Sequence, residues 1–335
     1  MDWATVTFKG DDALDLAKLH FGATLDSEWV VMERGGYGYS QSLKRGQVTI
    51  YHGGNVNPDT VSVVVSGQGC RQLEEEGLIG GPDVLLRGAS AWEAFLDELV
   101  RDGATFARLD VALDDRSGLL SITGMEESFR SGDCSTRFRD MRAEVGYTSE
   151  GVTTGHTLYF GSRQSLMFVR IYHKGLEQLA RGKAEGDPED WIRCELQARD
   201  ERADALVNQI IKHGMRSVAS VLWSYLDFKT PESRDKFKLS SDKYKRETVD
   251  WWKIFIDRVE KSRLGVAPKI VDVEKMKQWV KRQVAPTLHV IVNASALGWD
   301  FISSLVLEGG ERLKSHHINA LVAYNSKGKY QQCRA

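Results

Sequence analysis

The first half of the chain alternates hydrophobic and polar residues in short segments separated by glycine-containing turns. Such turns are present at 35–38 and 53–55. Alternation with a period of two residues is typical of a strand with one buried face. It is clearest at 105–114, at 156–173, where a turn predicts a hairpin, and at 190–199. The pattern therefore predicts a β-rich first half.

The second half places its apolar residues at helical spacing instead. A first helix is expected earlier, at 89–102, and the others follow from about residue 200, with prolines between several of them. The predicted helices of this half are 201–213, 218–228, 250–262, 273–283 and 296–307. Strands followed by helices are typical of an α+β fold. We expect a β-rich domain at 1–215 and a mainly helical region at 216–335.

Charge is unevenly distributed, although the net charge of the chain is only −2. Residues 1–107 hold 8 Lys+Arg and 16 Asp+Glu, a net of −8, whereas residues 216–282 hold 17 and 10, a net of +7. Phosphate binding needs a local basic surface rather than a basic average. The helical region is therefore the predicted DNA-holding part, although solvated charged faces would produce the same asymmetry. Its densest basic residues are Lys243, Lys245, Arg246, Lys275, Lys277, Lys281 and Arg282.

Several classes of protein do not fit the sequence. The four cysteines are far apart and form no C-x-x-C pair, so neither a zinc site nor a disulfide framework is indicated. The sequence contains no signal-peptide pattern and no apolar run of about 18 residues, so we expect a cytoplasmic protein without a membrane span. A phosphate-binding P-loop and a nucleophile elbow are also absent from the sequence.

Two of the predicted strands carry charged residues on one face. Residues two apart in a strand point to the same side of the sheet. In 105–114 the opposite face is apolar, so the charged face is the outer one. Each strand taken singly is also typical of an ordinary polar face with cross-strand ion pairs. The charged positions are Arg108, Asp110 and Asp114 in the first strand and Arg193 and Glu195 in the other.

A tyrosine stands between two basic residues on the strand that ends near 173. Arg170, Tyr172 and Lys174 share one face. A tyrosine hydroxyl has a pKa near 10 and becomes a useful nucleophile only with help from a base or a nearby positive charge. The two cations would also bind a phosphate. The three carboxylates named above would suit Mg²⁺ or Mn²⁺. Together these residues predict phosphodiester cleavage, provided that the strands are neighbours.

Four segments, taken in order, resemble the Rep_trans replication initiation factors. They are Arg108–Asp115, Tyr159–Ser165, Arg170–Lys174 and Arg193–Gln197, and the resemblance extends over roughly 35–290. That family includes initiators of rolling-circle plasmids and filamentous phages, and relaxases of some integrative conjugative elements. The resemblance implies a central antiparallel sheet that carries a nicking site, with helices around it.

The resemblance also implies roles for individual residues. Tyr172 would nick one strand at an origin, leaving a 5′-phosphotyrosine link and a free 3′-OH. Asp110 and Glu195 would help to hold the metal, and Asp114 matches the second aspartate of the family motif. Tyr159 would assist or would pack across strands. The expected DNA contacts are Arg108, Arg163, Arg193, Lys243, Lys245, Arg246, Lys281 and Arg282.

The expected partners are the double-stranded origin, the cleaved single strand, a host helicase with the replication machinery, and a second copy in a homodimer. Three alternatives stay open at this point. A conjugative relaxase would use the same chemistry, a DNA-binding regulator would lack catalysis, and a hydrolytic nuclease would activate water. Trp251, Trp252 and Trp279 would stack on bases or lie in the core of the helical region.

Overall fold

The computed structural model describes residues 1–22, 29–76, 78–79, 91–182, 190–261, 277, 280–294, 298–311, 313 and 324. Its contacts divide the chain into two units, Met1–Leu264 and Gly265–Ala335. This division falls later than the boundary predicted near residue 215, because the helices and strand of 217–261 pack within the first unit. The division of roles between 1–215 and 216–335 stays a prediction.

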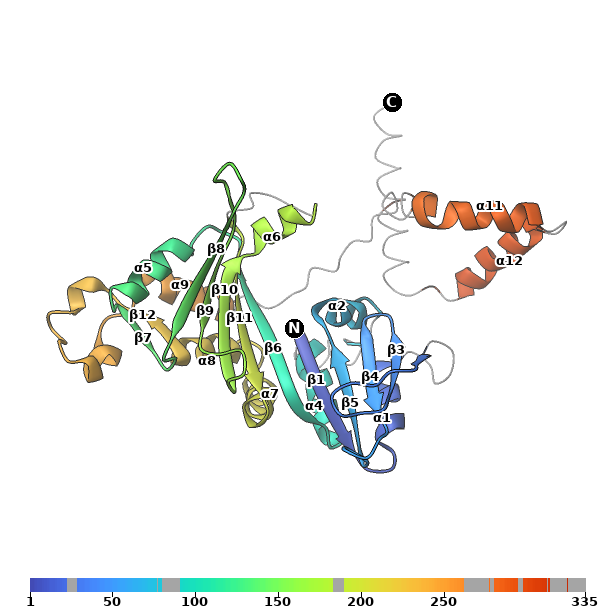
Figure 1. The fold of residues 1–335 in the computed structure, drawn as a ribbon, viewed down its shortest axis with the longest axis horizontal. Helices are drawn as coiled ribbons and strands as arrows, with labels where there is room; N and C mark the ends of the chain where they lie inside the picture. Colours follow the sequence, from blue (N-terminus) through green and yellow to red (C-terminus); the bar gives the residue numbers. More distant parts are fainter. Residues whose placement is uncertain are drawn as a thin grey trace. The chain divides into compact units, whose positions relative to one another are not determined.

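The first unit is built on a ten-stranded sheet in which every neighbouring pair is antiparallel (Figure 1). The strand order is β2-β3-β4-β5-β1-β6-β11-β10-β9-β8. A second sheet pairs β7 with β12. The strands are β1 Trp3–Lys9, β2 Val30–Met32, β3 Gln41–Arg45, β4 Val48–His52, β5 Thr60–Val65, β6 Thr105–Asp115, β7 Cys134–Thr136, β8 Met141–Tyr147, β9 Thr153–Phe160, β10 Met167–His173, β11 Ile192–Arg199 and β12 Leu226–Phe228.

Helices of the first unit flank this sheet, which confirms the predicted α+β fold. They are α1 Ala13–Phe21, α2 Gly67–Glu75, α4 Ala91–Arg101, α5 Ile122–Arg130, α6 Lys174–Ala180, α7 Glu201–His213, α8 Ser217–Tyr225 and α9 Asp250–Lys261, with short 3₁₀ turns η2 Pro231–Ser233 and η3 Ser240–Lys245. The second unit contains the π-helix η4 Val280–Val284, α11 Ala285–Ala294 and α12 Gly298–Glu311. None of the described helices is long and apolar enough to cross a membrane.

The helix predicted at 218–228 ends at Tyr225, because residues 226–228 leave it to pair with β7 as β12. The helix predicted at 273–283 falls mostly outside the described residues, although its last residues lie in η4.

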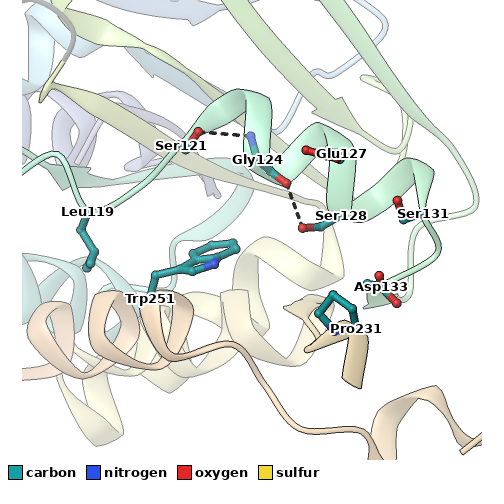
Figure 2. Close-up of a pocket in the computed structure, with 9 residues that line it drawn as sticks. All are labelled: Leu119, Ser121, Gly124, Glu127, Ser128, Ser131, Asp133, Pro231 and Trp251. Carbon is teal, nitrogen blue, oxygen red and sulfur yellow. Dashed lines mark hydrogen bonds between the residues drawn. The ribbon is translucent and has the colours of Figure 1, made fainter. Parts of the chain in front are cut away.

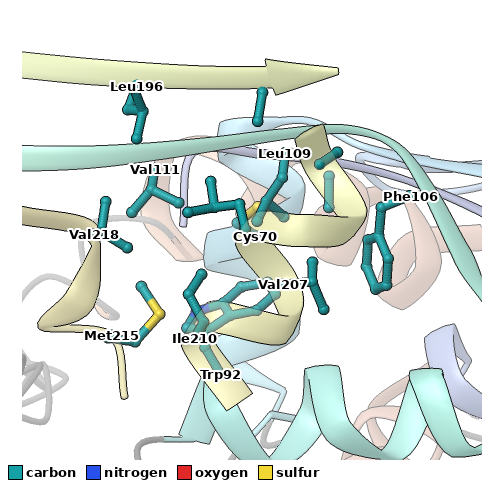
Figure 3. Close-up of a cluster of buried hydrophobic side chains, with 14 of the residues drawn as sticks. Cys70, Trp92, Phe106, Leu109, Val111, Leu196, Val207, Ile210, Met215 and Val218 are labelled. Atoms are coloured by element: carbon teal, nitrogen blue, oxygen red, sulfur yellow. The ribbon is translucent and has the colours of Figure 1, made fainter. Parts of the chain in front are cut away.

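The core lies between one face of the sheet and the helices. Leu109 and Val111 of β6, with Leu196 of β11, face Val207 and Ile210 of α7 (Figure 3). These positions are two apart in the strands and three apart in the helix, so each element presents one apolar stripe to the other. Burial of this face leaves the opposite face of the sheet for polar residues.

Candidate active site

Tyr172 lies at the centre of a polar cluster on the outer face of the sheet. Its hydroxyl donates a hydrogen bond of 2.6 Å to Glu195 Oε1. Arg170 donates from Nε to Glu195 Oε2 at 3.0 Å and forms a second bond from Nη2. The guanidinium of Arg170 also lies 4.7 Å from the centre of the Tyr172 ring. One carboxylate therefore joins the tyrosine to its neighbouring arginine.

Strand register produces this arrangement. Arg170 pairs with Glu195 across β10 and β11, and Tyr172 pairs with Arg193. Side chains of directly opposed residues lie close enough for such contacts. The sequence placed these strands in separate segments, and the structure makes β10, β11 and β6 neighbours.

Lys174 reaches the tyrosine from outside the strand. β10 ends at His173, and Lys174 is the first residue of α6. Its ammonium group nevertheless lies 5.6 Å from the centre of the Tyr172 ring and pairs with Glu177 at 2.6 Å. Lys174 was predicted on the strand face, so the expected neighbour is present although the local backbone is helical.

The protonation of Tyr172 and Glu195 follows from their burial. Burial raises the pKa of the Tyr172 hydroxyl, and the negative charge of Glu195 raises it further. Burial also raises the pKa of Glu195, against the opposing effect of the positive charge of Arg170. Tyr172 therefore holds its proton in this structure, and Glu195 has a raised affinity for a proton. The two groups share one hydrogen bond.

Arg193 connects two acids beside this pair. Its Nε and Nη2 donate to Asp114 at 2.7 and 2.8 Å, and its Nη1 donates to Asp2 at 3.2 Å. Burial raises the pKa of Asp114, but hydrogen bonds and charge from Arg193 outweigh it, so the net shift is downward. Asp114 is thus an ionised partner of Arg193. Asp2 had no signal in the sequence, because only β1–β6 pairing brings it here.

Asp110 lies on β6, like Asp114, and is bound by its own arginine. Arg108 donates to the two oxygens of Asp110 at 2.9 and 2.5 Å, and its guanidinium lies 4.5 Å from the ring centre of Trp3. Burial raises the pKa of Asp110, with the bond from Arg108 opposing it. Arg108 is therefore a partner of this carboxylate as well as a predicted DNA contact.

The acids fit a divalent ion in chemistry but are not gathered around one. Among the described residues, no three carboxylate, histidine or cysteine side chains converge as a metal site. Asp110 and Glu195 are buried carboxylates on adjacent strands, and the charge of Asp2 raises the pKa of both. Hard oxygen donors of this kind suit Mg²⁺ or Mn²⁺. A cation would also relieve the mutual repulsion of these acids.

Tyr159 lies next to the cluster, on β9. It pairs with Arg170 in the strand register and is 9% exposed. Its ring stacks on Phe168 at a centroid distance of 6.1 Å, and the guanidinium of Arg163 lies 5.3 Å from the ring centre. Cross-strand packing, one of the two predicted roles, is thus visible. An auxiliary role in the reaction stays a prediction.

The predicted DNA contacts in the helical region have different environments. Arg246 is buried, donates to the carbonyl of Phe237 at 3.1 and 2.9 Å, and cannot face a phosphate without breaking these bonds. Lys245 is exposed on η3, where Lys243 is half-buried. Lys281 is exposed in the second unit. The side chain of Arg282 and all of Lys275 lie outside the described residues, and Lys277 pairs with Tyr324 at 2.8 Å.

The three tryptophans that were predicted either to stack on bases or to lie in the core differ in their burial. Trp252 is fully buried, and its Nε1 donates to the carbonyl of Leu226 at 3.1 Å, so it belongs to the core. Trp251 is partly buried against the ring of Phe228. Trp279 lies outside the described residues.

A separate pocket of about 350 Å³ opens beside α5 (Figure 2). α5 packs on the apolar face of the sheet, where Phe129 meets Phe160. None of the residues around Tyr172 lines this pocket, so it is distinct from that cluster. Its lining is Leu119, Ser121, Gly124, Glu127, Ser128, Ser131, Asp133, Pro231 and Trp251.

An antiparallel sheet with a tyrosine, a carboxylate and arginines in contact on its outer face is an arrangement suited to phosphoryl transfer. Comparison with known proteins agrees with a DNA-nicking class of protein. Residues 104–306 match the family described as replication initiation factor, and the chain belongs to this family. Residues 1–80 match the N-terminal domain of rolling circle replication initiation proteins. The family resemblance of the sequence is thereby confirmed.

Two relatives cover most of the chain. A Bacillus subtilis (strain 168) protein assigned as a DNA relaxase, NicK, is 26% identical over 334 residues, which is 97% of this chain and 89% of the relative. A solved structure of a rolling circle replication initiator protein from Geobacillus stearothermophilus is 28% identical, with a TM-score of 0.63. That similarity covers 78% of this chain and 96% of the other.

Proposed function

We propose that this protein initiates rolling-circle replication by nicking one DNA strand at an origin, with Tyr172 as the nucleophile. The observation that carries the proposal is the 2.6 Å hydrogen bond from the Tyr172 hydroxyl to Glu195, bridged to Arg170. A nucleophile within hydrogen-bond reach of a base, with the base held by a third group, is the general arrangement for covalent catalysis. Family membership and both relatives support it.

Glu195 is positioned to accept the proton of Tyr172. As the proton moves to Glu195, the tyrosine oxygen bonds to the phosphorus, and the bond from phosphorus to the 3′ oxygen breaks. The products are a 5′-phosphotyrosine ester and a free 3′-OH, once the leaving oxygen has taken a proton from solvent. Because one phosphate ester replaces another, the bond energy is kept for rejoining. The raised pKa of Glu195 makes it a stronger base than a free carboxylate.

The cations of the cluster would bind the scissile phosphate. One edge of the Arg170 guanidinium binds Glu195, but the side chain is still 38% exposed. Its remaining N–H donors are therefore available to a phosphate oxygen. The ammonium group of Lys174 lies over the ring of Tyr172, as the guanidinium of Arg170 does. Arg193, held by Asp114 and Asp2, adds fixed positive charge across β11. Preorganised charge of this kind stabilises the charge that develops in phosphoryl transfer.

Asp110 and Glu195, with Asp2, are the residues that would hold Mg²⁺ or Mn²⁺. The bound ion would polarise the phosphoryl oxygens. Both acids accept two bonds from an arginine, but the pKa of Asp114 is lowered by Arg193 whereas that of Asp110 stays raised. Asp114 is therefore better suited to hold Arg193 than a metal ion.

A relaxase of a conjugative element is the second candidate, favoured by the full-length similarity to NicK. The chemistry would be the same, and the 3′-OH would serve transfer rather than replication. Both candidates take the origin or transfer site and the cleaved strand as DNA partners. A replicative role adds a host helicase and a second copy for termination.

The test is covalent capture of DNA. Supercoiled plasmids that carry a fragment library of the source genome are incubated with the protein and Mn²⁺, then denatured in detergent. The expected result is DNA attached to the wild type but not to Tyr172→Phe. Tyr147→Phe is the matched control, because Tyr147 is an exposed tyrosine of the same sheet. Adducts on Tyr172→Phe, or none on the wild type, would contradict the proposal.

A further inference from the structure

Three arginines from three places in the chain surround one tyrosine beside the candidate active site. Tyr159 pairs with Arg170 of β10 and with Arg142 of β8 in the strand register. The Arg142 guanidinium lies 5.0 Å from the ring centre of Tyr159. Arg163, from the turn between β9 and β10, lies 5.3 Å from the same point. The ring thus holds two further guanidinium groups by cation–π contact.

The charge of this cluster is poorly neutralised. Arg163 is exposed and forms no ion pair with the described residues. Arg142 pairs with Glu144 at 3.1 Å, but their side chains are 63% and 52% exposed, and exposed pairs contribute little stability. Two accessible guanidinium groups without a buried acid match an anionic ligand better than a structural role.

The tyrosine ring itself is held firmly. Tyr159 is 9% exposed, and its ring lies nearly parallel to that of Phe168, with an interplanar angle of 20°. Its hydroxyl forms no hydrogen bond with any of the described residues. The ring therefore positions the guanidinium groups, and the hydroxyl contributes little to the cluster.

We propose that Arg142, Tyr159 and Arg163 form a binding site for the sugar–phosphate backbone of the single strand next to the scissile phosphate. This rests on the proposed function, since it places the strand across β10, β9 and β8 from Tyr172. Neighbouring strands lie about 4.8 Å apart, so β8 is roughly 10 Å from β10, near enough for adjacent nucleotides of one strand. Guanidinium groups bind phosphate through paired hydrogen bonds. Tyr159 is then a positioning residue.

Binding to a labelled oligothymidylate tests this site. Anisotropy is measured in a chelator, so that no strand is cut, at several salt concentrations. We expect the double variant Arg142→Ala/Arg163→Ala to bind at least tenfold more weakly. The slope of log affinity against log salt should fall by about 1.4, since each single-strand phosphate contact contributes about 0.7. Loss of a merely structural group would not change that slope.

Arg130→Ala is the matched control. Its side chain is 74% exposed and pairs with Glu126, much as Arg142 pairs with Glu144, but it lies on α5. We expect it to keep the wild-type affinity and slope. An equal loss in this control would overturn the proposal. An unchanged affinity and slope in the double variant, or no binding by the wild type, would also overturn it.

Two variants of Tyr159 separate the ring from the hydroxyl. Tyr159→Phe keeps the ring, so the affinity and the salt slope should be retained. Tyr159→Leu should reduce the slope as the arginine variants do. Loss of binding in Tyr159→Phe would contradict the positioning role. If Tyr159→Leu fails to fold, as circular dichroism would reveal, the two exposed arginines still decide the proposal.

The two proposals fail in different ways. Absence of a covalent adduct on Tyr172 would overturn the proposed function without affecting binding measured in a chelator. An adduct with normal salt dependence in the double variant would overturn the strand site alone.

Discussion

At the scale of single residues, Glu195 is the group on which the site depends. It accepts a hydrogen bond from Tyr172 and binds Arg170, while only 6% of the residue is exposed. Asp114, which was predicted as a possible further metal ligand, accepts two hydrogen bonds from Arg193. The two acids therefore have different partners, although both belong to the same outer face.

Replacement of Glu195 tests its role as a base. Glu195→Gln keeps the size and can still accept a hydrogen bond, but it binds no proton at neutral pH. Because general base catalysis contributes about 10²- to 10⁴-fold, we expect adduct formation to slow by at least about 100-fold, with DNA binding retained. Single-turnover rates measure this. Glu201→Gln, at an exposed residue of α7, should react like the wild type. A normal rate in Glu195→Gln would refute the assignment.

At the scale of elements, strand pairing decides which residues meet. The predicted strands at 105–114, 156–173 and 190–199 correspond to β6, the β9–β10 hairpin and β11. Their alternation assigned the faces correctly, because the period of a strand is a local property. The basic segment of η3 shows the limit of such reasoning. Local charge does not reveal that Arg246 turns inward to the carbonyl of Phe237.

Arg246 is therefore predicted to stabilise the fold and not to bind DNA directly. Its removal would take both bonds from the partly buried Phe237 carbonyl. It would also remove a guanidinium that lies 3.6 Å from the buried Asp133, which would keep its ion pair with Arg234. We expect Arg246→Ala to lower the free energy of unfolding by about 2 kcal/mol. Urea unfolding measures it, and the exposed Lys245→Ala is the control. Equal stability of the two variants would show that Arg246 is not structural.

At the scale of the whole molecule, one sheet joins the two segments that match separate families. β1, from the 1–80 match, pairs with β6, from the 104–306 match. This pairing brings Asp2 to Arg193 and close to Asp110 and Glu195. The N-terminal segment therefore contributes a charged group to the candidate active site as well as a strand to the sheet.

Metal binding should reveal this shared site. We expect the wild type to bind Mn²⁺ by isothermal titration calorimetry, and Asp110→Asn and Asp2→Asn to bind it at least tenfold more weakly, because each would lose a charged oxygen ligand. Asp114→Asn is the comparison and should change the affinity less, since Arg193 lowers the pKa of Asp114 whereas the pKa of Asp110 is raised by burial and by the charge of Asp2. No Mn²⁺ binding by the wild type, or normal binding by Asp110→Asn, would contradict the metal proposal.

By itself the sequence determined the strands that carry the candidate site, the face on which Tyr172 lies with Arg170, and the family. These are properties of residue periodicity and short motifs, which involve near neighbours in the chain. Only the tertiary structure decided that Glu195 meets Tyr172, that Asp114 belongs to Arg193 and that Asp2 joins the cluster. Such contacts depend on strand order and register across long stretches of chain, and no local pattern specifies them.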